Sequence, residues 1–135
     1  MISVRCGVDM EEVSNVRNLL NISERARFRV FSEQEIGACE RAPNSDQHFA
    51  GRFCAKEALF KALGRGWQGM GWTEAEVHVD ESGAPRFVLH GSLKVKVHTL
   101  GVRSIGLGIS HTRDLATASV ILLCDPIKSM TQPDP

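Results

Sequence analysis

Glu57 and Lys61 carry opposite charges and are four residues apart in a stretch with helical periodicity. This spacing places both side chains on one side of a helix. Because most other positions of the stretch are apolar, we expect the helix to be covered on most sides, with the pair at the edge of a cleft. A carboxylate and an ammonium group at such an edge would be available to a charged ligand. The alternative is a solvated ion pair worth a few tenths of a kcal/mol, and the spacing alone favours that alternative.

Asp9 and His111 are candidates from opposite ends of the chain. Residues 2–10 alternate between apolar and polar types, which predicts a strand whose apolar side chains face the core and whose Asp9 points away from it. An Asp between a strand and a helix can bind a metal ion, but it more often caps the helix, and Asp9 with Glu12 matches a capping box. His111 lies where a later strand is expected to end, and a lone histidine in such a place is more often structural.

The helix that carries Glu57 has clear boundaries in the sequence. Pro43 closes the preceding segment, Asn44, Ser45 and Asp46 are possible caps, and Gly64 can adopt the left-handed conformation after the last turn. Its apolar positions form two faces, one of phenylalanines (Phe49, Phe53, Phe60) and one of Leu59 with alanines (Ala55, Ala58, Ala62). Arg52 with Lys56, and Glu57 with Lys61, form two narrow charged bands between these faces.

Capping residues and alternation predict the remaining elements. Ser23 precedes a short helix over 24–30, and Ser32 with Glu35 forms a capping box for a helix that ends near Arg41. Strand patterns occur at 76–79, 86–89, 104–110 and 116–123. Residues 93–97 fit another strand, although a short helix capped by Ser92 fits as well. One strand, then helices, then several strands is the order of an α+β fold with an antiparallel sheet.

Composition restricts the class of protein. The 135 residues fit one domain, which we place at 1–124, followed by a proline-containing tail over 125–135. The formal net charge is zero, so neither nucleic-acid nor membrane binding is indicated. The four cysteines (Cys6, Cys39, Cys54, Cys124) form no Cys-x-x-Cys pair and are expected to be buried thiols of a reducing compartment. No signal sequence or membrane-spanning run is recognised, which indicates a cytoplasmic protein.

Glycines punctuate the segment after the long helix. Gly64, Gly66, Gly69 and Gly71 indicate a loop whose backbone can approach a ligand closely. The segment lacks the Gly-Lys-Ser/Thr of a phosphate loop, so the glycines alone are weak support for a binding site.

Three separated motifs together resemble the holo-acyl-carrier-protein synthases, the small single-domain 4'-phosphopantetheinyl transferases. They are Gly7-Val-Asp-Met10, the run from Phe49 to Gly66 with its Gly-Arg-Phe and Lys-Glu-Ala-x-x-Lys cores, and Gly108-Ile-Ser-His-Thr112. The resemblance extends from about Ile2 to Leu123. It implies transfer of 4'-phosphopantetheine from coenzyme A to a serine of an apo acyl carrier protein, with release of adenosine 3',5'-bisphosphate.

The resemblance also implies roles for individual residues. Asp9 and Glu57 match the carboxylates that bind Mg²⁺, and Lys61 matches a catalytic lysine that meets the phosphates. Coenzyme A would be bound by Arg52, Lys61, Gly64, His111 and Thr112. The base that accepts the serine proton remains open between Glu57, Asp9 and a metal-bound water. His48, His78, His90 and His98 receive no role from the resemblance.

Carrier-protein binding and assembly follow from the same resemblance. Arg17 and Arg25 lie where the family presents basic residues to the acidic carrier, and the small members are homotrimers with sites between neighbouring chains. Two departures are expected to weaken coenzyme A binding: Ala84 replaces a basic residue that is frequent in the family, and the segment 41–47 offers only Arg41.

Two other functions are compatible with the sequence. A non-catalytic module that binds carrier proteins would keep the fold without turnover, although the intact Asp9, Glu57 and Lys61 argue against it. A small α+β domain in which these charged residues are only structural is the second, and it predicts that coenzyme A with Mg²⁺ does not raise the melting temperature.

Overall fold

The computed structural model describes residues 1–64 and 71–126 of the chain. Its main sheet is antiparallel, with the strand order β1-β5-β4, and a second antiparallel sheet pairs β2 with β3. The strands are β1 (Ser3–Glu12), β2 (Ala75–Val79), β3 (Pro85–Leu89), β4 (Val102–His111) and β5 (Leu115–Cys124). The predicted α+β class with antiparallel strands is confirmed.

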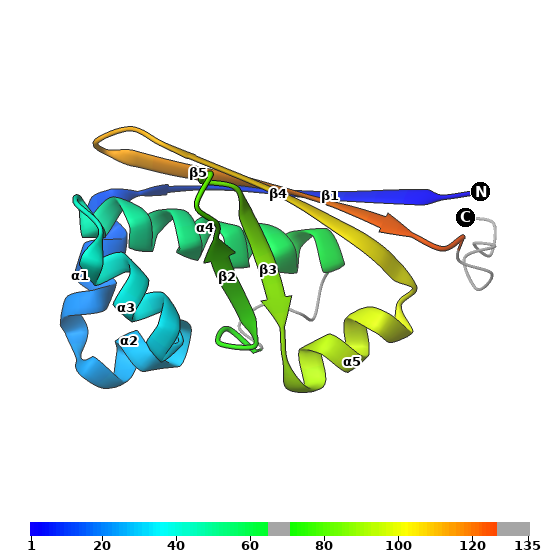
Figure 1. The fold of residues 1–135 in the computed structure, drawn as a ribbon, viewed down its shortest axis with the longest axis horizontal. Helices are drawn as coiled ribbons and strands as arrows, with labels where there is room; N and C mark the ends of the chain where they lie inside the picture. Colours follow the sequence, from blue (N-terminus) through cyan, green and yellow to red (C-terminus); the bar gives the residue numbers. More distant parts are fainter. Residues whose placement is uncertain (65–70, 127–135) are drawn as a thin grey trace.

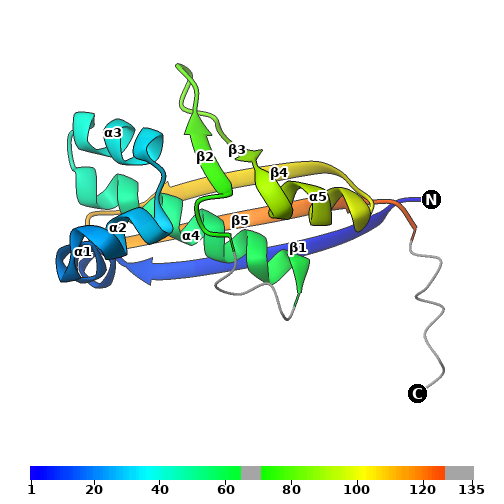
Figure 2. The same cartoon turned by 90° about the horizontal axis from the view of Figure 1, so that it is seen from below.

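Helices cover one face of the main sheet. They are α1 (Val13–Ile22), α2 (Glu24–Val30), α3 (Glu33–Arg41), α4 (Ser45–Leu63) and α5 (Gly91–Thr99). In Figure 1, α4 runs along the strands beneath the sheet, α1 to α3 gather at one end, and α5 lies toward the other. Figure 2 shows the β2-β3 hairpin beside α4, next to β4. No helix in the described ranges is both long and apolar enough to cross a membrane.

The predicted helix boundaries agree with the structure where local side chains define them. The Ser23 hydroxyl accepts from the backbone N–H of Ala26, and Ser32 and Glu35 form the predicted capping box of α3. Gly64 ends α4 with φ of 104°, a conformation that favours glycine. Asn44 is the N-cap of α4, although its side chain makes no capping hydrogen bond. The rest of the predicted glycine loop, 65–70, lies outside the described residues.

The predicted orientation of β1 is wrong. Val4, Val8 and Met10 are exposed, at 59%, 59% and 63%, whereas Gly7 and Asp9 are buried. The cause is the close approach of α4: a Cβ on Gly7 would collide with the backbone of Ala58 and Ala62. Only glycine permits this contact, so the face with Gly7 and Asp9 packs on α4, and the apolar face of β1 points outward.

The exposed face changes two further predictions. Cys6 belongs to it and is exposed, whereas Cys39, Cys54 and Cys124 are buried as expected. The capping box of Asp9 with Glu12 is also wrong, because β1 continues through Glu12 and α1 begins at Val13 without a side-chain cap. Asp9 is therefore a strand residue that faces α4.

Residues 91–99 form a helix, so of the two alternatives for this segment the helix is confirmed and the strand is wrong, although Ser92 is not its cap. The N-cap of α5 is His90, and the carboxylate of Glu74 accepts from the backbone N–H groups of Ser92 (3.0 Å) and Leu93 (3.2 Å). Ser92 also donates its hydroxyl to Glu74. A negative charge at the first turn stabilises a helix, and here it comes from a residue that is eighteen positions away.

Asp125 follows the last residue of β5 and contacts residues at the start of β4. Its N–H donates to the backbone oxygen of Gly101 (2.8 Å), and its carboxylate pairs with Arg103. It is therefore held by the fold, although we expected it to be the first residue of the tail. Residues 127–135 of that predicted tail lie outside the described residues.

Candidate active site

Asp9 and Lys61 meet where α4 crosses β1. Lys61 Nζ donates to Asp9 Oδ1 (2.8 Å) and to the backbone oxygen of Val8 (3.1 Å). Asp9 is only 7% exposed, and its Oδ2 has no hydrogen-bond partner in the structure. Glu57, one turn before Lys61 on α4, is half-buried beside them. Lys61 therefore forms its ion pair with Asp9. The alternative of a solvated ion pair between Glu57 and Lys61 is wrong.

The electrostatics of this group favour a bound cation. Burial and the neighbouring Asp9 carboxylate raise the pKa of Glu57, and Lys61 only partly opposes them. Burial and the same carboxylates raise the pKa of Glu11. The hydrogen bond to Asp9 raises the pKa of the Lys61 ammonium group. Three carboxylates and one ammonium group leave an excess of negative charge, which a divalent cation would neutralise.

Sequence analysis missed Glu11. It follows Asp9 by two residues, and side chains two apart on a strand point to the same face. The signal was therefore present, but the assumption that Asp9 ended the strand concealed it. We define Asp9, Glu11, Glu57 and Lys61 as the carboxylate cluster.

Cys54 lies beneath this cluster and is a structural thiol. Its Sγ donates to the backbone oxygen of Ala116 (3.4 Å), and the residue is completely buried. Burial and the charges of Asp9 and Glu11 raise the pKa of Cys54 to about 12. A thiol with this pKa stays protonated at neutral pH and is not a nucleophile.

The ligands that the carboxylate cluster offers suit Mg²⁺ better than they suit a metal ion that is bound by protein side chains alone. Asp9 Oδ2 is a buried oxygen without a donor among the described residues, and Glu57 could supply a second hard oxygen ligand. No group of three or more His, Cys, Asp or Glu within the described part of the chain is arranged to hold a metal by itself. Mg²⁺ is commonly held by one or two carboxylates, with substrate phosphates and waters as its other ligands.

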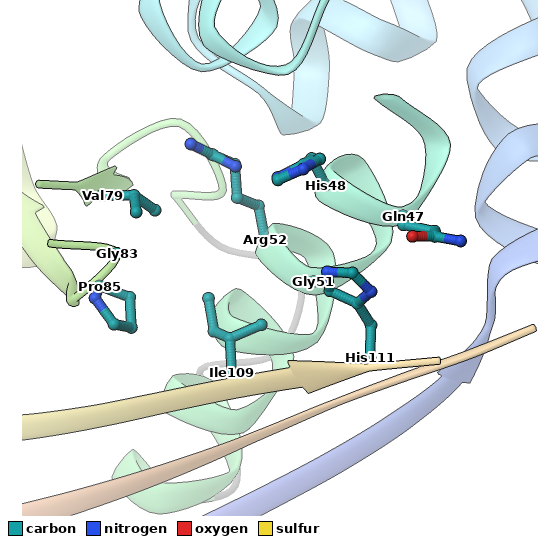
Figure 3. A pocket seen from close by; sticks show the side chains of 9 residues that line it. All are labelled: Gln47, His48, Gly51, Arg52, Val79, Gly83, Pro85, Ile109 and His111. Atoms are coloured by element: carbon teal, nitrogen blue, oxygen red, sulfur yellow. The ribbon is translucent and has the colours of Figure 1, made fainter. Parts of the chain in front are cut away.

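Arg52 and His111 line a pocket on the other side of α4 (Figure 3). The pocket has a volume of about 200 Å³ and lies between α4, the end of β4 and the β2-β3 hairpin. His48 also lines it, and its ring contacts that of His111 edge to face at 5.8 Å. Arg52 is 6% exposed, and its Nε has no hydrogen-bond partner in the structure. The pocket is smaller than the range of about 300–1,000 Å³ that encloses a whole drug-sized ligand.

Thr112 and Gly64 do not line this pocket. Thr112 closes the β4-β5 turn: its N–H donates to the backbone oxygen of Leu115, and its hydroxyl accepts from the N–H of Leu115. Gly64 lies at the far end of α4, where a Cβ would approach the side chain of Arg5. Of the predicted coenzyme A residues, the pocket brings together Arg52 and His111.

The pocket and the carboxylate cluster lie toward opposite edges of the main sheet. Asp9 on β1 pairs with Ala118 on β5, and Ala118 pairs with Ile109 on β4, whose side chain lines the pocket. Two strand spacings, roughly 10 Å, therefore separate Asp9 from Ile109. The α4 helix lies over the strands between them, and a Cβ on Gly51 would collide with Ile109.

A buried ion pair fixes α4 against β2 and α3. Lys56 Nζ donates to Glu35 Oε1 (2.8 Å) and to the backbone oxygens of Trp72 (2.6 Å) and Ala75 (2.9 Å). Glu35 Oε2 accepts from the N–H of Val77 (2.9 Å). Both charged side chains are 0% exposed. Lys56 adjoins Glu57 in sequence, so this network holds the turn of α4 that presents the carboxylate cluster.

The two arginines predicted to bind a carrier protein lie on α1 and α2. Arg17 pairs with Asp46 through Nε and Oδ2 (2.6 Å), and the pair is about half exposed. Arg25 is exposed on α2. Exposed ion pairs contribute little to stability, so Arg17 can exchange Asp46 for another carboxylate at little cost.

Known proteins are similar to this chain in sequence and in fold. Residues 5–118 match the family described as ACPS, 4'-phosphopantetheinyl transferase superfamily. A holo-[acyl-carrier-protein] synthase of Solibacter usitatus is 39% identical over 121 residues, which are 88% of this chain and 97% of the relative. The corresponding synthase of Clostridium acetobutylicum is 36% identical over 116 residues, 86% of this chain and 94% of the relative.

A solved structure agrees with this result. The Chronobacterium ammoniagenes ACPS-CoA complex superposes with a TM-score of 0.82 at 28% sequence identity, over 92% of this chain and 99% of that chain. The resemblance found in the three sequence motifs is therefore confirmed, and the chain belongs to the 4'-phosphopantetheinyl transferase superfamily.

Proposed function

We propose that this protein is a holo-acyl-carrier-protein synthase, with residues 1–124 as its transferase domain. It would transfer 4'-phosphopantetheine from coenzyme A to a serine hydroxyl of an apo acyl carrier protein. The observation that carries the proposal is the meeting of Asp9, Glu57 and Lys61 in one cluster, from two segments that are far apart in the sequence. Family membership and the coenzyme A complex of a structural relative support the donor substrate.

The reaction forms a bond between the serine oxygen and the phosphorus next to pantetheine, and it breaks the bond to the second phosphate. Adenosine 3',5'-bisphosphate leaves, and the serine proton passes to a base. Lys61 is 44% exposed, so its ammonium group can leave Asp9 for a phosphate oxygen and stabilise the leaving group. Glu57, with its raised pKa, can accept the serine proton when one of its oxygens is free.

Asp9 and Glu57 would hold Mg²⁺. The unpartnered Oδ2 of Asp9 is available to it, and Glu57 would lose its unfavourable contact with Asp9. The ion, when bound, would neutralise charge on the pyrophosphate. Arg52 and His111, in their pocket, would bind phosphate groups of the donor.

The active form would be a homotrimer with sites between chains. Large apolar side chains are exposed on the outer face of the main sheet, among them Val8 and Met10 on β1 and Ile121 on β5. An exposed apolar patch of this kind is typical of a protein interface. The carboxylate cluster and the pocket lie toward opposite sheet edges, so a ligand held by both is most simply bound between neighbouring chains. Three is the number that the family resemblance implies.

The carrier protein would dock on α1 and α2. Arg17 and Arg25 are exposed there and would face carboxylates of an acidic partner. Replacing either arginine by Glu should therefore raise the KM for the carrier more than the KM for coenzyme A.

Intact-mass spectrometry tests the transfer. An apo acyl carrier protein is incubated with the protein, coenzyme A and Mg²⁺, beside a Glu57→Ala control. We expect a mass increase of one phosphopantetheine group with the native chain and none with the control. If folded native protein modifies none of several carriers but still binds them, the chain is a non-catalytic binding module.

Light scattering during size-exclusion chromatography tests the assembly. Val8→Lys places a charge on the exposed face of β1 and should lower the mass from three chains toward one. Val95→Lys is the matched control, because Val95 on α5 is about as exposed as Val8, at 65% against 59%. An unchanged trimer in the Val8 variant would remove this face from the interface.

A further inference from the structure

We propose that His48 is a further phosphate-binding residue of the donor site, acting with His111 and Arg52 in the pocket between α4, β4 and the β2-β3 hairpin. The inference rests on the proposed function, since it assumes that the donor carries phosphate groups. It concerns a residue to which the sequence assigned no role.

The pocket places His48 for this task. His48 and His111 come from different elements, yet their rings lie 5.8 Å apart with an angle of 62° between their planes. Figure 3 shows the Arg52 side chain leaving α4 one turn after His48, on the same side of the pocket. Arg52 is more than nine-tenths buried, and its Nε lacks a hydrogen-bond partner within the described part of the chain. A buried guanidinium nitrogen without an acceptor indicates that an anion binds here.

Among the residues that the structure describes, no carboxylate lines the pocket. The other lining residues carry no charge: Gln47, Gly51, Val79, Gly83, Pro85 and Ile109. The segment 42–47 before His48 contains no Lys or Arg, and Ala84 at the hairpin adds no charge. Within the described pocket, positive charge for a phosphate can come only from Arg52 and the two imidazoles.

The charges around His48 fit an anion-binding site. Burial lowers the pKa of His48, and Arg52 and His111 lower it further. These are the groups that act on it, Arg52 from its own helix and His111 from β4. A phosphate bound between them would reverse this effect, because a nearby anion favours the imidazolium form. Donor binding should therefore be coupled to proton uptake by the protein.

The first measurement compares His48→Gln with the native chain in the transfer assay. Glutamine keeps a hydrogen-bond donor but cannot carry charge. Losing a charge-assisted hydrogen bond predicts a rise of about tenfold or more in the KM for coenzyme A, larger than any fall in kcat. His98→Gln is the matched control, because His98 is an exposed histidine on α5, away from this pocket. Equal KM values for the native chain and His48→Gln would overturn the proposal.

Dephospho-coenzyme A identifies the phosphate. If His48 binds the 3'-phosphate, His48→Gln raises the KM for coenzyme A and leaves that for dephospho-coenzyme A unchanged. If it binds the pyrophosphate, both KM values rise. A fall in kcat alone, with both KM values unchanged, would also contradict phosphate binding by His48.

Calorimetry separates this inference from the proposed function, because it needs no turnover. Coenzyme A is titrated into the protein without a carrier, at pH 7, in buffers of different ionisation enthalpy. The native chain should take up protons on binding, and His48→Gln should take up fewer. Native protein that binds coenzyme A in this way but transfers nothing would refute the proposed function alone. Identical proton uptake and affinity in the variant would refute the role of His48 alone.

Discussion

Lys56→Met should destabilise the protein strongly, although Lys56 belongs neither to the carboxylate cluster nor to the lining of the pocket. Methionine fills a similar volume but removes all three hydrogen bonds of Nζ, to Glu35, Trp72 and Ala75. It leaves the backbone oxygens of Trp72 and Ala75 without this donor, and it leaves the Glu35 carboxylate, which is 0% exposed, without its counter-ion. Removing one partner of a buried ion pair costs about 3–5 kcal/mol. This is a large part of the roughly 5–15 kcal/mol that stabilises a typical domain.

Urea denaturation at one fixed protein concentration measures this loss, as a lower transition midpoint with an unchanged slope. Arg103→Met is the matched control, because it removes a cation from an exposed pair with Asp125 and should cost about 0–1 kcal/mol. Adding Glu35→Gln to Lys56→Met should recover part of the stability, since no unpaired buried charge remains. A loss below about 1 kcal/mol for Lys56→Met, or no recovery in the double variant, would refute the reasoning.

Two further predictions concern the contact of α4 with β1 and the charge of the carboxylate cluster. Gly7→Ala should lower the free energy of unfolding by about 3 kcal/mol or more, or prevent folding, because its Cβ would collide with the α4 backbone. Thermal melts measure this loss. Gly108→Ala on β4 is the control, because no atom lies within 4 Å of the added Cβ. Glu57→Gln should raise the melting temperature in EDTA and remove the rise that Mg²⁺ gives to the native chain. The folded protein binds the Glu57 proton more tightly than the unfolded chain does, because the pKa of Glu57 is raised from 4.5. The metal-free native chain should therefore lose stability relative to the variant as the pH rises above 4.5, and parallel stability curves would contradict this sign.

Local signals were sufficient for most of the secondary structure. Ser23, and Ser32 with Glu35, define helix starts through hydrogen bonds to residues three positions away, so the sequence contains the whole interaction. The hairpin of β4 and β5 follows from period-two alternation in the same way. The positive φ of Gly64 after α4 is likewise a local property.

Predictions failed where the deciding partner is distant in sequence. Glu74 holds the first turn of α5 from the turn that precedes β2, so the alternation of apolar residues and lysines over 93–97 left a strand and a helix equally open. Alternation in β1 gave the correct period but the wrong face. Which face is buried depends on α4, whose backbone approaches Gly7 so closely that no side chain fits.

The candidate site shows the same division. The sequence by itself determined the helical spacing of Glu57 and Lys61, the motif that contains Asp9, and the family that these residues indicate. Only the tertiary structure decided that Lys61 pairs with Asp9, that Glu11 joins them, and that His48 faces His111 beside a buried arginine. The physical reason is that hydrogen bonds, burial and charge act over a few ångströms in space, whereas sequence patterns report neighbours along one element.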